Sequence, residues 1–434
     1  MTTDQVGPSG AIRCSYVDES LQVCVPVLAF FYRERLDAAR LAEGLARVLA
    51  DFPAYAGRLA WRDGALYIEP SQDGVRFEEQ ASVEPVQSLT AAARSGDYKA
   101  LVPPLSVRRM LRGGEPLLAV RLTNAPGGCV LAFAFNHALG DLTSSMLLLR
   151  AWSNACRGLA YDKPLHVPDR HRYLLQHLPD APDARASLRL FAPSEMLRVA
   201  RHATTRKRRV ELRFEAGELE RIQRAASRQR EVSRHDALCA HVALALRQLD
   251  PRAPRHQLSV VIDYRRRLGL PANAPGNLIS MVQVPLPARS DDLPRVAAEL
   301  RQAIERFAER PDYLPTARLL SAHTSAVERL RCLPLAADPR VAALVLVSWT
   351  GQGVSDLVFE SQRPALFLPL GRTAVPYVGS CHESSEASER TVSLCLPDHV
   401  AAVLDTERGR GLVHRYADEP VRAAASGSAA PPFS

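Results

Sequence analysis

The stretch CVLAFAFNHALGDLTSSMLLLRAW, residues 129–152, is the segment that most restricts how this chain can fold. It opens as an almost unbroken apolar run over 129–135 and, after a glycine, continues behind Asp141 with helical spacing. An apolar run of this length bounded by turn residues indicates a buried strand, and the change of period indicates a helix. The pattern therefore predicts a buried strand, a short loop carrying His137, and a helix over 143–156 capped by Asp141 or Thr143.

Strand-like and helix-like segments alternate along the rest of the chain, which favours an α/β fold. Helical spacing predicts helices over 36–51, 216–229 and 233–249. Strands are expected as a hairpin over 57–61 and 65–68, and over 117–122, 210–214, 258–262, 281–284, 342–347, 365–368 and 391–396.

The length of 434 residues exceeds what one hydrophobic core usually supports, so two domains are expected. The regular pattern weakens over 161–209, where prolines and arginines are frequent. We expect a first domain over 1–180, a crossover over 181–209 and a second domain over 210–422. A disordered tail is expected over 423–434, which is rich in small residues.

The formal net charge of +8 favours anionic partners. The arginines are spread along the chain without a nucleic-acid-binding motif, so a nucleic acid is not expected as a partner. The densest cluster, 206–209, is typical of a solvated connector, and a phosphorylated small ligand would also exploit the charge. The N-terminus has no signal-like segment and no apolar stretch reaches about 18 residues, so a cytoplasmic protein without a membrane span is expected.

The eight cysteines are scattered without ligand-like spacing. In a chain of this length they are interpreted as reduced thiols, and neither a disulfide framework nor a metal site is expected.

His137 is the candidate for chemistry, because a neutral imidazole can take a proton near neutral pH. It could act as a general base toward a hydroxyl or an amine. The alternative is a histidine satisfied by nearby backbone carbonyls. A histidine four residues before an acid arises about once by chance in such a chain, so the spacing alone is weak.

Residues 137–141, HALGD, resemble the HxxxD motif of the BAHD acyl-CoA-dependent acyltransferases. Four other segments resemble motifs of that family and occur in the family's order, which makes the set specific for a divergent member. They are DFPAYAGRL at 51–59, VSRHDALCAHV at 232–242, IDYRRR at 262–267 with Gly-Asn at 276–277, and VSW at 347–349 with Arg-Pro at 363–364.

The resemblance implies a chloramphenicol-acetyltransferase-like fold, with two similar-sized α/β domains and an active-site channel between them. His137 would deprotonate the acceptor, whose oxygen or nitrogen attacks the thioester directly, so no cysteine need be a nucleophile. Acyl-CoA would be a co-substrate and no cofactor would be bound permanently. The acceptor would be a small-molecule alcohol or amine, and the enzyme a monomer of specialised metabolism.

The resemblance also assigns roles to residues around His137. Asp141 is expected in a structural ion pair with an arginine such as Arg265. The indole of Trp349 is expected to stabilise the oxyanion, with core packing as the alternative. Ser233 and Arg234, with the 206–209 cluster, are candidates for the CoA mouth.

Three departures from the family pattern leave alternatives open. Leu142 replaces a glycine, Val347 replaces a threonine, and 358–362 keeps only the phenylalanine of the family's DFGWG element. Asp356 or Glu360 could replace the acid lost from that element. A degenerate member that binds without turnover remains an alternative, as does transfer from a carrier protein, although Asn136 stands where the doubled HHxxxDG has its first histidine.

Overall fold

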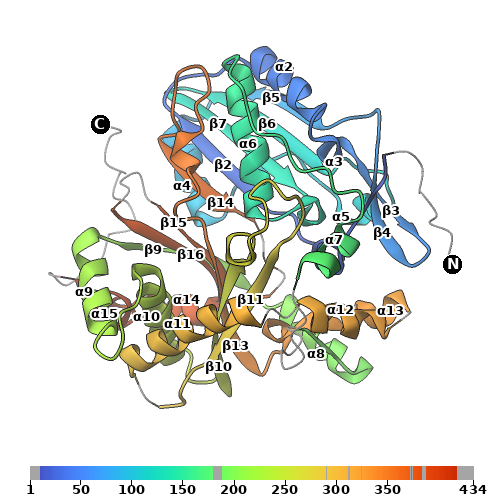
Figure 1. Cartoon of the computed structure of the whole chain (residues 1–434). Coiled ribbons are helices and arrows are strands. Elements are labelled where there is room, and N and C mark those ends of the chain that lie inside the picture. The colour runs from blue at the N-terminus through green and yellow to red at the C-terminus, as the bar shows by residue number, and fades with distance from the viewer. Residues whose placement is uncertain are drawn as a thin grey trace.

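The computed structural model describes residues 10–178, 188–289, 291–310, 313–323, 325–371, 373, 375–383 and 388–417. Two large sheets, each with its own helices, form the two halves of the molecule (Figure 1). The first half of the chain forms the upper part and the second half the lower part, as the change of colour from blue to red shows. The expected tail over 423–434 lies outside the described residues.

The first sheet has five strands in the order β14-β2-β7-β6-β5. Their bounds are β2 Val27–Tyr32, β5 Arg76–Ala81, β6 Leu118–Ala125, β7 Gly128–Phe135 and β14 Leu366–Leu370. Every residue of β2 and β7 is buried, which explains why both are apolar throughout rather than alternating. One face packs against α2 (Ala38–Leu49) and α6 (Leu142–Cys156), and the other packs against α4 (Val86–Ser95).

The strand β14 belongs to the second half of the sequence but completes the sheet of the first. It pairs antiparallel with β2, with Leu366 opposite Phe31 and Leu370 opposite Val27. Figure 1 shows β14 as part of the orange ribbon that enters the upper half. The expected domain bounds of 1–180 and 210–422 stay a prediction, and β14 is the strand that crosses them.

A small sheet and several short helices flank the first half. The expected hairpin is confirmed as β3 (Arg58–Arg62) and β4 (Ala65–Glu69), which β1 (Ile12–Arg13) extends to three strands. The neighbouring helices are α1 Tyr16–Leu21, α3 Pro53–Ala56 and α5 Val107–Met110.

The second sheet has six strands in the order β11-β10-β13-β15-β16-β9. Their bounds are β9 Lys207–Phe214, β10 Arg255–Asp263, β11 Ile279–Pro285, β13 Val341–Ser348, β15 Val378–Glu383 and β16 Arg390–Pro397. The strand β13 runs parallel to both of its neighbours, β10 and β15.

Helices cover the face of the second sheet that points away from the first half. They are α9 Ala216–Ala226, α10 Arg234–Leu249, α11 Leu293–Glu309, α14 Asp398–Leu404 and α15 Glu407–Val413. Nearly every residue of α10 is buried, because the helix lies between the sheet and its neighbouring helices. The expected helices and strands are thus confirmed, with ends that differ by a few residues.

The crossover expected over 181–209 stays a prediction, and the part of it that the structure describes has regular structure. After α7 (Arg170–His177), residues 188–209 form β8 (Leu188–Leu190), α8 (Pro193–Ala203) and the start of β9. β8 pairs with β12 (Cys332–Pro334), near α12 (Tyr313–Ser321) and α13 (Ala326–Arg329). The 206–209 cluster is therefore not a solvated connector, because most of it begins a strand that pairs with β16.

Two further properties of the described part of the chain bear on function. No helix in it is both long and apolar enough to cross a membrane. All eight cysteines have free thiols, as the sequence indicated.

Candidate active site

The histidine loop follows β7 directly, as its sequence predicts. Residues His137–Leu139 form a short 3-10 turn behind the buried Asn136. The Asn136 carboxamide accepts a hydrogen bond from Ala138 N at 2.9 Å and donates one to Gln22 O at 2.8 Å. The asparagine therefore caps the turn and ties it to the segment after α1.

The His137 imidazole is half-buried, and its ring centre lies 6.3 Å from that of Phe135. Its Nδ1 is enclosed without a hydrogen-bond partner, and no described residue bonds to Nε2. Burial lowers the pKa of the imidazole below its ordinary value, and weaker contributions from its own carbonyl and from Asp141 oppose this. The ring is therefore neutral at physiological pH and is able to accept a proton.

The carbonyls of the turn are held by a buried arginine from α7. Arg170 donates from Nη1 to Ala138 O and to Leu139 O, at 3.1 Å each. The same nitrogen lies 3.6 Å from Asp18 Oδ2 of α1. Both ionic side chains are almost fully buried, and Arg170 thereby links the turn to Asp18 of α1.

A second contact comes from Asn277, near the start of β11. Its side-chain nitrogen donates to His137 O at 2.8 Å and to Asp18 Oδ1 at 2.7 Å, and its backbone N also donates to Asp18. All three carbonyls of the turn are thus bonded to side chains from distant parts of the chain.

Asp141 forms the ion pair that the resemblance implies. Its carboxylate accepts from both terminal nitrogens of Arg265, at 2.7 and 3.1 Å, and both side chains are almost fully buried. It also accepts from Ser144 N, which caps α6, and from Leu278 N at 2.9 Å. Four donors fill the carboxylate, so its contacts hold the loop against β11 and leave it no bond to His137.

Two glycines allow this close approach of the halves. Gly140 and Gly276 form an isolated bridge, and Gly276 has φ +95. A Cβ at Gly140 would lie 2.6 Å from Ser144 Cβ, and one at Gly276 would lie 3.1 Å from Arg170 Cδ. A side chain at Gly140 would clash with Ser144 of α6, and one at Gly276 would press on Arg170 at a strained φ.

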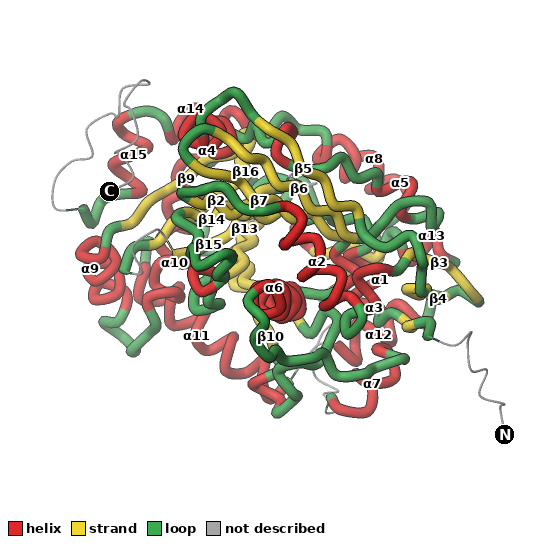
Figure 2. Tube along the Cα trace, turned by 90° about the horizontal axis from the view of Figure 1, so that it is seen from above, coloured by secondary structure: helices red, strands yellow, loops and turns green. Residues whose placement is uncertain are grey.

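Seen from above, α6 lies near the middle of the molecule, viewed almost along its axis (Figure 2). Asp141 is the N-cap of α6, and Arg265 follows β10, so the ion pair joins the two halves at the start of α6. His137 lies four residues before Asp141, at the start of the 3-10 turn.

Trp349 directly follows β13 and is 8% exposed. Its backbone N donates to Cys381 O at 2.7 Å, and its ring lies 5.2 Å from that of Phe367 on β14. The indole N–H donates to no described residue. The indole nitrogen is not fully enclosed, so this free donor is accessible to a bound group.

The residues before Trp349 have no free hydroxyl at the family's threonine position. Val347 has none, and the Ser348 hydroxyl is bonded to that of Thr350 at 2.8 Å.

The two residues expected at the CoA mouth lie at the start of α10. Ser233 is its N-cap and accepts from Asp236 N and from Arg301 Nη2 at 3.1 and 3.0 Å. Arg234 is half-exposed and pairs with Glu220 at 3.3 Å. The sequence analysis missed Arg301, because it lies on α11, far from the quoted motif.

Neither acid proposed to replace the lost DFGWG aspartate does so, and that expectation is wrong. Asp356 pairs with Arg363 at the surface, and Glu360 accepts from Asp37 N. Arg265 instead pairs with two other acids, at 2.7 Å each. Asp141 belongs to the first half of the molecule, and Asp263 belongs to the second half, as Arg265 does.

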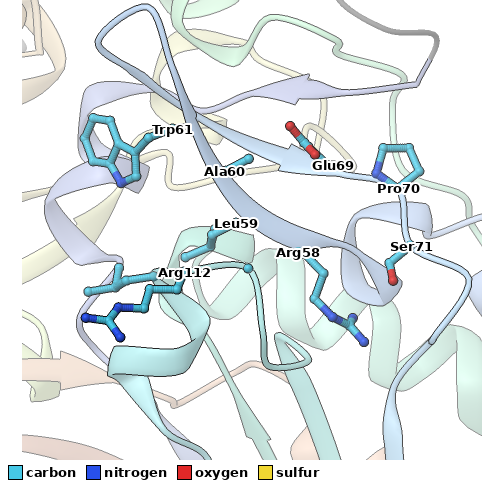
Figure 3. Close-up of a pocket in the computed structure, with 10 residues that line it drawn as sticks. Arg58, Leu59, Ala60, Trp61, Glu69, Pro70, Ser71 and Arg112 are labelled. Carbon is cyan, nitrogen blue, oxygen red and sulfur yellow. The ribbon is translucent and has the colours of Figure 1, made fainter.

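A surface pocket of about 410 Å³ lies away from this site, between the β3–β4 hairpin and the end of α5 (Figure 3). Arg58, Trp61, Ser71 and Arg112 line it, and no residue of the histidine loop does. Arg58 donates from Nη1 to three backbone carbonyls, so it is already committed to the fold. Among the described residues, no group of three or more His, Cys, Asp or Glu side chains is arranged to hold a metal ion.

Two residues of the site escaped the sequence analysis. Asp18 lies three positions after Ser15 and forms a capping box with it, a spacing that is legible in the sequence. Arg170 carries no comparable signal, because its partners Ala138 and Leu139 are backbone carbonyls.

Comparisons with known proteins agree with this arrangement. A model of the Transferase family matches residues 3–392. The chain is similar to BAHD acyltransferase DCR of Arabidopsis thaliana, with 31% identity over 197 residues, a match that spans only 39% of each chain. It is also similar to hydroxycinnamoyl-CoA:5-hydroxyanthranilate N-hydroxycinnamoyltransferase HHT4 of Avena sativa, with 26% identity over 77% of this chain and 78% of the relative.

The fold has a close counterpart among solved structures. TRI101 of F. sporotrichioides, solved with coenzyme A and T-2, superposes with a TM-score of 0.70 at 19% identity. The superposition covers 93% of this chain and 98% of that one. The expected two-domain α/β fold is therefore confirmed.

Proposed function

This chain belongs to the Transferase family, the BAHD acyltransferases, and we propose from that premise that it moves an acyl group from acyl-CoA to a small-molecule alcohol or amine. The observation that carries the proposal is the His137 imidazole, which is neutral and has no hydrogen-bond partner at Nδ1, on a turn whose carbonyls are all bonded. A base held in this way needs little rearrangement to meet a substrate.

In the proposed reaction, His137 takes the proton of the acceptor hydroxyl or amine as its oxygen or nitrogen attacks the thioester carbonyl. The carbonyl oxygen becomes negative, and the Trp349 indole N–H donates to it. When the tetrahedral intermediate collapses, the carbon–sulfur bond breaks and the CoA thiolate takes the proton from the imidazolium. The products are the acylated acceptor and free CoA, and His137 returns to its neutral state.

Arginines near the start of α10 support acyl-CoA as the donor. Burial lowers the pKa of Arg267. Asp263 raises this pKa, and the positive charges of Arg301 and Arg266 lower it. Such crowding of cations favours an anion, and CoA carries phosphates. We propose that Ser233 and Arg234 lie at the edge of this site, with Arg267 and Arg301 closer to the phosphates.

The proposal is tested by incubating the protein with mixed acyl-CoAs and a metabolite extract and detecting acylated products by mass spectrometry. The expected result is a product that requires acyl-CoA and is absent with His137→Ala. Products formed only from an acyl-carrier protein would instead indicate a condensation-type transferase. Binding of CoA in calorimetry without any product would indicate a family member that has lost turnover.

A further inference from the structure

A set of polar side chains lies beside Trp349 on the second sheet. Ser380 of β15 is opposite Val347 of β13, and His382 of β15 is opposite Thr391 of β16. Residues two apart on a strand share a face, so Ser380, His382 and Thr391 form one group, here called the polar patch.

The polar patch is turned toward the first half. The His382 ring packs edge-on against Phe367 of β14 at 6.0 Å, and Phe367 in turn lies 5.2 Å from both Trp349 and Phe30. The opposite face of the same strands carries Cys381, which packs in the core with α10. The polar patch therefore lies between the halves, close to the proposed oxyanion donor.

The polar groups of this patch lack partners. Ser380 is 9%, Thr391 5% and His382 2% exposed. Nδ1 of His382 is enclosed without a partner, whereas the two hydroxyl oxygens bond to no described residue and are not fully enclosed. Buried polar groups in folded proteins are nearly always hydrogen-bonded. The enclosed Nδ1 of His382 therefore indicates a partner that comes from outside the chain, and the two unbonded hydroxyls lie on the same patch.

The charge around the polar patch selects against a cation. Burial, with Arg209 and Arg213 on β9, lowers the pKa of His382 to about 3, so its ring is neutral. The acid nearby, Glu211, is already paired with Arg209 at 3.1 Å. The neutral ring offers no negative charge to an ammonium group, whereas a neutral hydroxyl needs none.

The sheet order places Arg267 and the polar patch on opposite sides of β13. β10 and β15 lie on opposite sides of β13, whose end carries Trp349. Arg267, after β10, lies on the side proposed for the CoA phosphates, and the polar patch lies on the other side. The patch is therefore left for the acceptor.

We propose that Ser380, His382 and Thr391 bind the acceptor, and that this acceptor is a neutral, hydroxyl-bearing molecule with one apolar face rather than an amine cation. The inference rests on the proposed function. Hydroxyls and a neutral imidazole each donate and accept, so they match hydroxyl groups of a ligand. Phe30 and Phe367, on the facing sheet, supply the apolar contact.

A stability comparison tests the polar patch without any turnover. Ser380→Ala and Thr391→Val remove hydroxyls that have no partner, so the Tm is expected to stay equal or to rise. Ser153→Ala is the matched control, because its buried hydroxyl bonds to Val358 O at 2.7 Å and accepts from Val358 N at 3.0 Å. The control is expected to lower the Tm. A similar fall in the two patch variants would overturn the proposal, since it would reveal partners within the chain.

Kinetics then test the ligand. With an acceptor identified by mass spectrometry, the Ser380→Ala/Thr391→Val double variant is expected to raise the KM for the acceptor by about tenfold and to leave that for acyl-CoA within about twofold. A rise confined to acyl-CoA, or products made mainly from polyamines such as putrescine, would overturn the proposal. If the wild-type protein gives no product, the proposed function fails and the acceptor assignment with it, whereas the stability result alone reports on the patch.

Discussion

The two sides of the candidate site differ in how completely their polar groups are bonded. On the histidine loop every carbonyl of the turn and the Asp141 carboxylate have partners, and only the His137 ring is free. At the end of β13 the Trp349 indole is free, and the neighbouring polar patch is unpaired. The histidine loop therefore holds a base in a fixed position, whereas the end of β13 keeps its hydrogen-bond donors free for substrates.

The largest effect should come from breaking the fixed side. Arg265→Met leaves the buried Asp141 carboxylate without its cation, and we expect a loss of about 3–5 kcal/mol in the free energy of unfolding, measured by urea denaturation. Arg267→Met is the control, because that side chain is only partly buried and bonds to a single carbonyl, Asp263 O. Equal effects of the two changes would contradict the account of the loop.

Removing the donor on the free side should act on turnover instead. Trp349→Phe keeps the ring contact with Phe367 but removes the indole N–H, and we expect kcat to fall by about 10²–10³ with little change in Tm. In Trp152 the indole is already bonded to Leu41 O at 2.8 Å. Trp152→Phe should therefore lower the Tm and leave kcat nearly unchanged. The reverse pattern would show that Trp349 only packs.

The glycine contact between the halves should couple stability to turnover. Gly276→Ala places a methyl group against Arg170 at a positive φ, and we expect a loss of about 1–3 kcal/mol in stability together with a lower kcat. Gly269 also has a positive φ, but a Cβ there meets open space. Gly269→Ala should lower stability only, as thermal unfolding and steady-state kinetics can both report.

The smallest effect concerns the missing hydroxyl. Val347→Thr restores a hydroxyl at the family's threonine position, and one more neutral hydrogen bond to the oxyanion corresponds to a gain in kcat of about tenfold or less. Unchanged or lower turnover would show that Trp349 and the backbone already satisfy the oxyanion, or that the hydroxyl faces elsewhere.

Local patterns predicted the local part of the fold. The apolar run of β7, the glycine turn and the Asp141 cap of α6 lie next to one another in sequence, so their structure follows from periodicity and capping. β2 was missed although its six residues are all apolar, because a short apolar run does not distinguish a strand from a buried helix. The pairing of β14 with β2 joins segments more than 300 residues apart, which no local pattern reports.

The residues of the candidate site also fall into two groups, those that local motifs predict and those that only the fold brings together. His137, Asp141 and Trp349 stand in short motifs, and the resemblance supplied Arg265 as a partner for Asp141. Arg170 was not foreseen, since its role depends on which carbonyls the fold brings to it. The polar patch was also missed, because Ser380, His382 and Thr391 come together only through the strand register.

The central claim is that a neutral His137 imidazole takes the proton of the acceptor. Single-turnover acyl transfer measured across pH, in the wild-type protein and in His137→Ala, tests it most directly. Because burial lowers the pKa of His137, the wild-type rate should be constant near neutral pH and should fall as the pH drops through a pKa below about 6.5. His137→Ala should be slower by about 10²–10⁴ at neutral pH, with this inflection absent and the fold unchanged by circular dichroism. A variant that keeps most of the rate, or the same inflection, would contradict the account.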